Sequence, residues 1–298
     1  MEDFLYEAVE IIQTIWDGIL FGSTYALIGI GFTLIFGAMG KLNMAYAAAA
    51  IAGAYVGLAV SMFFDAPIIM VFAVSATFST FMGYFVYQSC FRFIPTNNHL
   101  AALMASVGGL FLIDEIIVHT TLGSPMNFPA LFEDAYFEIG PFGIRGDLLF
   151  VFFIGIVSTV LLLYVLYKTR LGMATRAVAQ QDVAAQLCGI NIHRTNSITF
   201  SIAGFLGGIA GAMTAAAVGI LSPVMTVPLT IKGLIVTVIG GLGSIPGAII
   251  AGLFVGAFEN FFLYIRGIDE RDMYVVGLLF IFLIFRPNGI FSKTINRD

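Results

Sequence analysis

Residues 15–37 read IWDGILFGSTYALIGIGFTLIFG, an apolar run in which Asp17 is the only charged residue. The hydrocarbon core of a bilayer is about 30 Å thick, so a helix needs about 20 mostly apolar residues to cross it. The run is continuous rather than alternating, which favours a helix over the strands of a membrane barrel. This stretch therefore predicts a transmembrane helix.

Apolar stretches of similar length recur along the chain, separated by Gly, Pro and charged residues. One stretch, 230–243, is short, contains Lys232 and runs into GGLGSIPG at 240–247, so it is predicted to be either a crossing or a broken, re-entrant helix. The sequence predicts an all-α, polytopic transmembrane bundle of about eight or nine spans, forming a single domain over residues 1–298. The predicted spans are 15–37, 44–64, 67–90, 99–120, 147–167, 196–217, 230–243, 247–265 and 273–286.

The composition also predicts a membrane protein. Hydrophobic residues make up 59% of the chain and charged residues 10%, against roughly 25% charged in an average soluble domain. The two cysteines, Cys90 and Cys188, have neither the number nor the spacing of a disulfide framework or a metal site, so we expect free thiols. The chain begins MEDFLYEAVE, which is acidic where a cleavable signal peptide is positive, so we expect no segment to be removed.

Basic residues are distributed unequally between the two sides of the predicted bundle. With the N-terminus outside, nine of the 13 Lys and Arg face the inside and three face the outside, while Lys232 is unassigned. The positive-inside rule therefore places the C-terminus in the cytoplasm of a bacterial-type inner membrane, with 121–146 as an extracytoplasmic loop and 168–195 as a cytoplasmic loop. The inside residues are Lys41, Arg92, Lys168, Arg170, Arg176, Arg194, Arg286, Lys293 and Arg297, and the outside residues are Arg145, Arg266 and Arg271.

No catalytic pattern is present in the sequence. His99, His119 and His193 are scattered over different segments without a metal-ligand or triad spacing, and neither H-E-x-x-H nor GxxxxGK[ST] occurs. No patch of basic and aromatic residues suggests nucleic-acid binding. We therefore expect no enzyme activity, no metal and no bound cofactor in this chain.

The predicted cytoplasmic loop contains a short helix. Residues 168–195 read KTRLGMATRAVAQQDVAAQLCGINIHRT, in which 174–187 is rich in helix formers and Gly189 suits a left-handed cap. The small residues Ala184 and Ala185 would let the backbone of a partner approach closely. An ordinary loop helix lying on the membrane is the alternative interpretation.

Four stretches resemble known transporter sequences, in the same order as in those proteins. All four resemble stretches of branched-chain amino acid permeases, a family that also serves other amino acids and, in relatives, urea and short amides. Within the second stretch, the spacing Ala184-Ala185-x3-Gly189 resembles the EAA-x3-G coupling loop of ABC importer permeases, with Val183 in place of the Glu. The four stretches are GSTYALIGIGFTLIFGAMGKLNMAYA (22–47), AVAQQDVAAQLCGIN (177–191), GGLGSIPGAIIAGLFVGAFEN (240–260) and FRPNGIF (285–291).

The resemblance implies a permease subunit of an ATP-driven importer of branched-chain or other neutral amino acids. It implies a second, different permease, two cytosolic P-loop ATPases that bind ATP and Mg, and an extracytoplasmic substrate-binding protein as partners. The residues expected to couple to the ATPase are Asp182, Ala184, Ala185, Gly189, Ile190 and Asn191. The candidates for the substrate path or gate are Asn43, Tyr46, Gly240, Gly241, Gly243 and Glu259.

Several alternatives remain open on the sequence. Relatives usually have Ala-His-Gly after the residue that matches Asn43, whereas this chain has Tyr46 in place of the His, so the cargo or the gate differs if this stretch faces the path; both residues could equally be interfacial anchors. Glu259 lies deep in a span, where an ionised group costs roughly 2.5–3.5 kcal/mol, so it is protonated, paired to a neighbouring helix or in the path. The functional alternatives are a urea or short-amide importer, a passive channel or secondary transporter, and a structural scaffold.

Overall fold

The computed structural model describes residues 2–95, 98–129, 136–139, 142–268, 270–286 and 289–291, and most of these residues are helical. The α-helices are α1 (Glu2–Met39), α2 (Ala45–Phe64), α3 (Ile68–Val86), α4 (His99–Thr121), α5 (Gly146–Lys168), α6 (Arg170–Gln180), α7 (Asp182–Leu187), α8 (Ile192–Val218), α9 (Thr226–Gly240), α10 (Ile245–Arg266) and α11 (Arg271–Phe285). A π-helical segment, η1 (Tyr87–Phe91), continues α3, and a 3-10 turn, η2 (Pro223–Met225), precedes α9. Two antiparallel strand pairs complete the description: β1 (Met126–Asn127) with β4 (Ile220–Leu221), and β2 (Tyr136–Ile139) with β3 (Phe142–Arg145).

The structure confirms a polytopic helical bundle. Eight segments of the described chain are long and apolar enough to cross a membrane; each overlaps one of the first eight predicted spans, and the seventh is shifted toward the N-terminus. The ninth prediction, 273–286, corresponds to α11, whose 15 residues rise only about 22 Å at 1.5 Å per residue. The seventh prediction, 230–243, misplaced its helix, because Pro223–Gly240 forms one span that stops before the glycine-rich turn.

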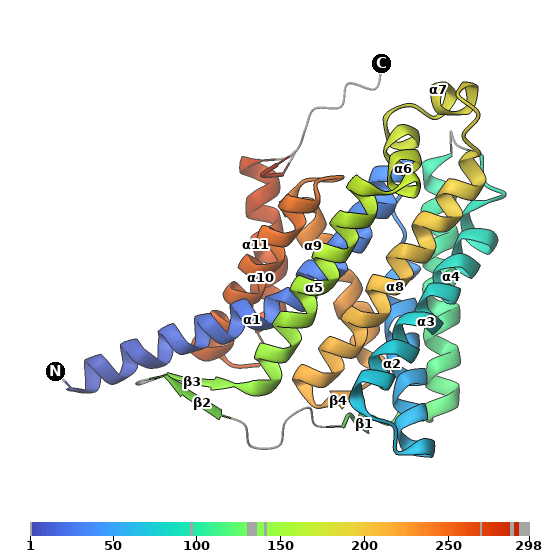
Figure 1. Ribbon diagram of the computed structural model, residues 1–298. Helices are drawn as coiled ribbons and strands as arrows, with labels where there is room; N and C mark the ends of the chain where they lie inside the picture. Colours follow the sequence, from blue (N-terminus) through green and yellow to red (C-terminus); the bar gives the residue numbers. More distant parts are fainter. Residues whose placement is uncertain are drawn as a thin grey trace.

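Successive spans alternate in direction, so α1 begins and α11 finishes at opposite ends of the bundle (Figure 1). The α6 and α7 helices lie at the end where α11 finishes, and both strand pairs lie at the end where α1 begins (Figure 1). We call these the C-terminal end and the N-terminal end of the bundle. The segments 130–135 and 140–141 of the predicted outer loop, and Lys293 and Arg297, lie outside the described residues.

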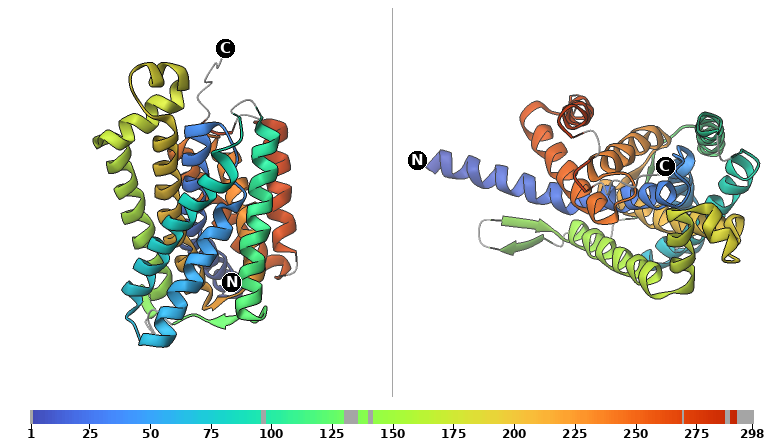
Figure 2. Two further views of the ribbon diagram at one scale, coloured as in Figure 1. Left: turned by 90° about the vertical axis from the view of Figure 1, so that its right-hand side faces the viewer. Right: turned by 90° about the horizontal axis from the view of Figure 1, so that it is seen from above.

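The first helix is longer than the predicted span 15–37. Its 38 residues rise about 57 Å, well beyond the thickness of the hydrocarbon core, and its first turns project from the bundle (Figures 1 and 2). Apolar length located the membrane-crossing part of this helix but not its start, because the acidic residues before it are also compatible with helix. Gln13 Nε2 in this projecting part donates a hydrogen bond of 2.9 Å to the Gly143 carbonyl of β3.

Small residues let the helices pack backbone to backbone. A Cβ added at Gly18 or Gly22 of α1 would lie 2.7 and 2.8 Å from the carbonyl oxygens of Gly256 and Gly252 of α10. Neighbouring helices in lipid commonly associate through such small residues, since lipid gives no hydrophobic drive for helix association. The glycines at these positions therefore allow the close approach of α1 to α10.

The α2 helix packs closely against α3 and α8. Every residue from Ala45 to Ala54 is buried, and a Cβ at Gly53 would lie 2.6 Å from the Ser75 carbonyl of α3. A Cβ at Gly211 of α8 would lie 2.5 Å from the Ala50 carbonyl. The small residues of α2 and α8 therefore let the backbones of these three helices approach one another closely.

Candidate functional site

The predicted coupling segment forms two short helices rather than the single helix expected over 174–187. The chain breaks at Gln181, whose backbone is extended with φ −159° and ψ 111°, so α6 and α7 are separate. Gly189 has φ +82°, as predicted for a left-handed cap. The turn is closed by backbone hydrogen bonds from Gly189 to Gln186, 2.9 Å, and from Ile190 to Ala185, 3.0 Å.

The α7 helix presents an exposed, partly apolar surface at the C-terminal end of the bundle. Asp182, Ala184 and Gly189 are exposed, while Ala185 is buried. Val183 and Leu187, on the same short helix, are 66% and 85% exposed. Asn191, another predicted coupling residue, caps α8 by accepting a hydrogen bond of 3.1 Å from the Arg194 N–H; Ile190 is partly exposed.

Hydrogen bonds connect this segment to the membrane spans. The Thr175 and Thr199 hydroxyls lie 3.3 Å apart, which joins α6 to α8. The Tyr87 hydroxyl of η1 lies 3.2 Å from Nδ1 of His193, at the start of α8. A movement of α6 and α7 would therefore displace α8 and, through α8, the end of α3.

The glycine-rich turn after α9 lies against the C-terminal segment. Gly241 and Gly243 have φ of +99° and +86°, and Ser244 caps α10 by accepting a hydrogen bond of 3.3 Å from the Gly247 N–H. The Ile290 N–H donates to the Ile239 carbonyl, 2.9 Å, and the Phe291 N–H donates to the Gly240 carbonyl, 3.3 Å. The third and fourth stretches that resemble branched-chain permeases are thus in contact, although residues 287 and 288 lie outside the described part.

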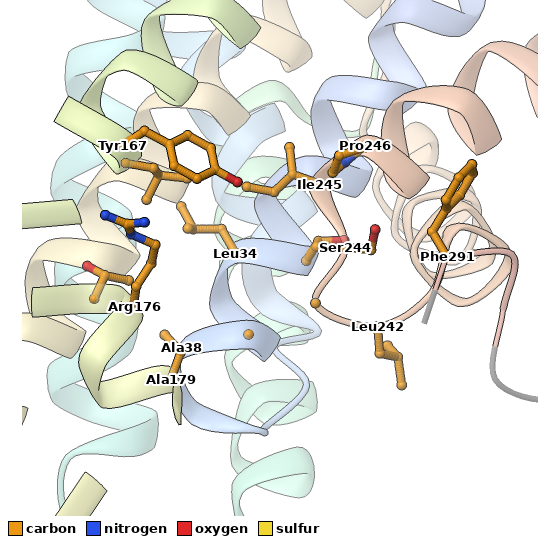
Figure 3. Close-up of a pocket in the computed structure, with 15 residues that line it drawn as sticks. Leu34, Ala38, Tyr167, Arg176, Ala179, Leu242, Ser244, Ile245, Pro246 and Phe291 are labelled. Atoms are coloured by element: carbon orange, nitrogen blue, oxygen red, sulfur yellow. The ribbon is translucent and has the colours of Figure 1, made fainter. Parts of the chain in front are cut away.

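A cavity of about 440 Å³ lies between this glycine-rich turn and α6 (Figure 3). It brings Gly243 and Ser244 to the same space as Arg176, whose guanidinium lies 5.1 Å from the ring centre of Tyr167. The cavity is therefore shared by the glycine motif and the helix that precedes the predicted coupling residues. Its lining is Thr33, Leu34, Gly37, Ala38, Leu166, Tyr167, Thr175, Arg176, Ala179, Leu242, Gly243, Ser244, Ile245, Pro246 and Phe291.

Asn43 and Tyr46 lie inside the bundle and do not line this cavity. The Tyr46 ring, 2% exposed, occupies the space beside Gly31 of α1 and Gly207 of α8 and meets the Phe32 ring edge-on at 5.0 Å. Its hydroxyl has no hydrogen-bond partner among the described residues. Asn43 accepts a hydrogen bond of 3.1 Å from the Ala45 N–H. Such burial does not suit interfacial anchors.

The connection between α1 and α2 holds a buried cation. The Lys41 ammonium donates to the carbonyls of Pro95 and Ile94 at 3.2 and 3.5 Å. Burial lowers the pKa of Lys41 below its ordinary value, because it disfavours the charged form. Lys41, which is predicted to face the inside, therefore links the connection between α1 and α2 to the connection between η1 and α4.

Glu259 belongs to a buried network of charges near the N-terminal end. Its Oε1 lies 2.8 Å from Nζ of Lys232 and 3.4 Å from Nε of Arg271. Lys232 also lies 2.9 Å from Oδ1 of Asp272 and 3.4 Å from the Tyr25 hydroxyl. The network joins α1, α9, α10 and α11.

The positive-inside rule left Lys232 unassigned and placed Arg271 on the outside. The useful signal was the presence of opposite charges in two consecutive spans, each of which needs a partner in lipid. Pairing between neighbouring helices is one of the explanations considered for Glu259, and the structure supports it.

The described residues contain no group of three or more His, Cys, Asp or Glu side chains placed to hold a metal ion. An apolar bundle of spans, with a largely apolar cavity and two short helices at one end, is the architecture expected of a membrane permease. Residues 14–284 match the family model described as the permease component of the branched-chain amino acid transport system, and the chain belongs to this family. This confirms the resemblance to the family, whose model covers the first three of the four stretches, and a multi-pass inner-membrane location.

Curated relatives align over nearly the whole chain. The chain is 29% identical to the high-affinity branched-chain amino acid transport system permease BraD of Pseudomonas aeruginosa, over 96% of this chain and 97% of that protein. It is 27% identical to the permease LivH of the same type from Escherichia coli strain K12, over 98% and 97%. It is 28% identical to the ribose import permease RbsC of the same strain, over 64% and 61%.

Proposed function

We propose that this chain is a permease subunit of an ATP-driven importer that, with a second and different permease, forms the path for branched-chain or other neutral amino acids. The observation that supports this most strongly is family membership over 14–284, together with full-length similarity to BraD and LivH. The chain has the architecture of a path-forming subunit, and the chemistry of ATP hydrolysis, with its Mg, is supplied by two partner ATPases.

The α7 helix and the turn at Gly189 are the proposed contact with an ATPase subunit. Their exposed apolar side chains, Val183 and Leu187, have no role in the bundle itself, and Gly189 has open space around its Cβ position. The cavity beside Arg176 links this contact to the glycine motif at Gly240, Gly241 and Gly243, which we propose as the moving inner part of the path. In this arrangement 168–195 is cytoplasmic and 121–146 is extracytoplasmic, where a substrate-binding protein docks.

The cargo of the importer has more than one candidate. The chain is also 28% identical to a ribose import permease over 64% of its length, and a urea or short-amide importer would have the same build. The two full-length relatives favour amino acids. Ligand binding by the substrate-binding protein that works with this chain would decide between these cargoes.

Co-purification tests the partners, and the Gly189→Arg variant tests the contact. A tagged copy is extracted from its native membrane in mild detergent, and co-purifying proteins are identified by mass spectrometry. We expect a second permease and P-loop ATPases with the unmodified chain.

Gly189→Arg should insert normally but lose ATP-driven uptake, because a long cation cannot enter a close backbone contact.

Gly267→Arg is the matched control. Gly267 also has positive φ, +85°, and open space around its Cβ position, but it follows α10, outside both 168–195 and 121–146, so the substitution introduces similar backbone strain away from the proposed contacts. Recovery of the chain alone, under conditions that preserve known complexes, would favour a channel or a secondary transporter. Unchanged uptake by Gly189→Arg would refute the assignment of the coupling contact.

A further inference from the structure

Four spans form the edge of the bundle and expose one face each: α3, α4, α5 and α10 are the least buried of the eight spans. In a membrane such a face meets lipid, a partner subunit or water, and each of these favours different side chains. The residues on the four faces can therefore be compared directly.

The exposed face of α5 is suited to lipid. Its exposed side chains Phe153, Val157 and Val160 are apolar, and Asp147 at the start of the helix is paired with Arg145 at 2.5 Å. On α10, Glu259 is 3% exposed and lies within the ion-pair network. The α3 helix has no Asp, Glu, Lys or Arg between Ile68 and Val86.

The exposed face of α4 is different. Glu115 and His119, one helical turn apart, have side chains that are 71% and 85% exposed, and Nδ1 of His119 lies 3.6 Å from Oε1 of Glu115. Beside them, Oδ1 of the partly buried Asp114 has no hydrogen-bond partner among the described residues. Of these four spans, α4 alone has an exposed carboxylate within the described residues of the span.

Depth in the membrane argues against lipid on this face. Glu115 lies six residues before the last residue of α4, Thr121, which is about 9 Å along the helix axis. A carboxylate at this depth is costly in hydrocarbon and is retained mainly beside a partner or a water-filled cavity. The opposite side of α4 packs on α2 and η1, so this face is turned away from the bundle (Figure 2).

We propose that the face of α4 formed by Gly108, Leu112, Glu115 and His119 borders the water-filled path between this chain and the second permease. The proposal rests on the proposed function, since it needs a partner that forms the other wall. All four residues are exposed, they follow one another at helical spacing, and a Cβ at Gly108 meets nothing within 4 Å. Glu115 and His119 are then solvated by the path, which removes the cost of exposing them to lipid.

Cysteine accessibility in the assembled complex tests this directly. Glu115→Cys is made in a Cys90→Ser, Cys188→Ser background, and a membrane-impermeant maleimide is added to native membranes. The thiolate is the reactive form, so a thiol in water reacts far faster than one in hydrocarbon. The matched control is Phe153→Cys on α5, which is 63% exposed and lies at a similar depth, seven residues after Gly146.

We expect Glu115→Cys to react at least about tenfold faster than Phe153→Cys. Gly108→Cys, on the same face and deeper in the membrane, should also react and provides a second variant if Glu115→Cys assembles poorly. The proposal is overturned if both positions react as slowly as Phe153→Cys in the intact complex.

Expression without the second permease gives the other arm of the test. The face of α4 should then meet lipid, and labelling should fall to the rate of Phe153→Cys. Undiminished labelling would show that Glu115 reaches water without a partner and would also overturn the proposal. Failure to find any second permease is detected separately by co-purification, so it is distinguishable from a wrong assignment of this face.

Discussion

Removal of the Lys232 ammonium would leave Glu259 buried without its nearest counter-charge. Breaking a buried ion pair by deleting one partner typically costs about 3–5 kcal/mol, since the remaining charge is desolvated and unpaired. We expect Lys232→Met to lower the free energy of unfolding of the purified chain in mild detergent by about 3–5 kcal/mol, seen as a lower midpoint of thermal unfolding. The double variant Lys232→Met, Glu259→Met should recover most of the loss, because it leaves no unpaired charge.

Arg266→Met serves as the control for this pair of variants. Arg266 is exposed near the end of α10 and no salt bridge to it is found among the described residues, so its replacement should change stability by less than about 0.5 kcal/mol. Equal stability of Lys232→Met and Arg266→Met would contradict a stabilising network.

Glu259 and Tyr46 show which contacts of single residues the sequence does not predict. The need of Glu259 for a partner followed from its depth in a span, but the identity of the partner depends on how α9, α10 and α11 are rotated about their axes. Tyr46 was singled out because it departs from relatives. Its place between Gly31 and Gly207 could not be predicted, since it depends on contacts between α1, α2 and α8.

At the scale of elements, the contact between α1 and α10 depends on the absence of side chains. A Cβ at Gly252 would clash with the Ala26 backbone, so Gly252→Leu should separate the two helices and destabilise the chain by at least about 1–3 kcal/mol, the usual cost of overpacking. The midpoint of thermal unfolding and the yield of monodisperse protein measure this effect.

Gly277→Leu on α11 is the comparison, because a Cβ there meets nothing within 4 Å. Leucine is the better helix former by up to about 1 kcal/mol, so this variant should be neutral or slightly stabilising. Destabilisation of both variants to the same degree would mean that helix propensity or membrane insertion, rather than the contact with Ala26, sets the result.

Elements were predicted well where apolar length decides and less well where it does not. The first eight spans were located because each must provide about 20 apolar residues. The break at Gln181, the strand pairs and the first turns of α1 lie outside the apolar stretches long enough to cross a membrane, so membrane thickness gives no constraint on them. The candidate site was predicted as separate motifs, and only the folded chain shows that 240–247 and 289–291 touch.

For the whole molecule, the distribution of charge predicts which end faces the cytoplasm. Cys188, exposed on the turn after α7, reports this end directly, whereas Cys90 is buried. In a strain that makes this chain without its partners, a membrane-impermeant maleimide should label inside-out vesicles and leave intact spheroplasts unlabelled. A Cys188→Ser variant gives the background, and labelling of intact spheroplasts instead would reverse the orientation.

The uneven packing of the bundle also has a mechanical consequence. Backbone contacts such as Gly18 with Gly256 leave little empty volume between α1 and α10, whereas the cavity beside Arg176 holds about 440 Å³. Helices in such close contact are hard to shift, because any movement breaks many contacts at once. The open space beside Arg176 gives α6 and the glycine-rich turn room to move relative to each other without the same loss of contacts.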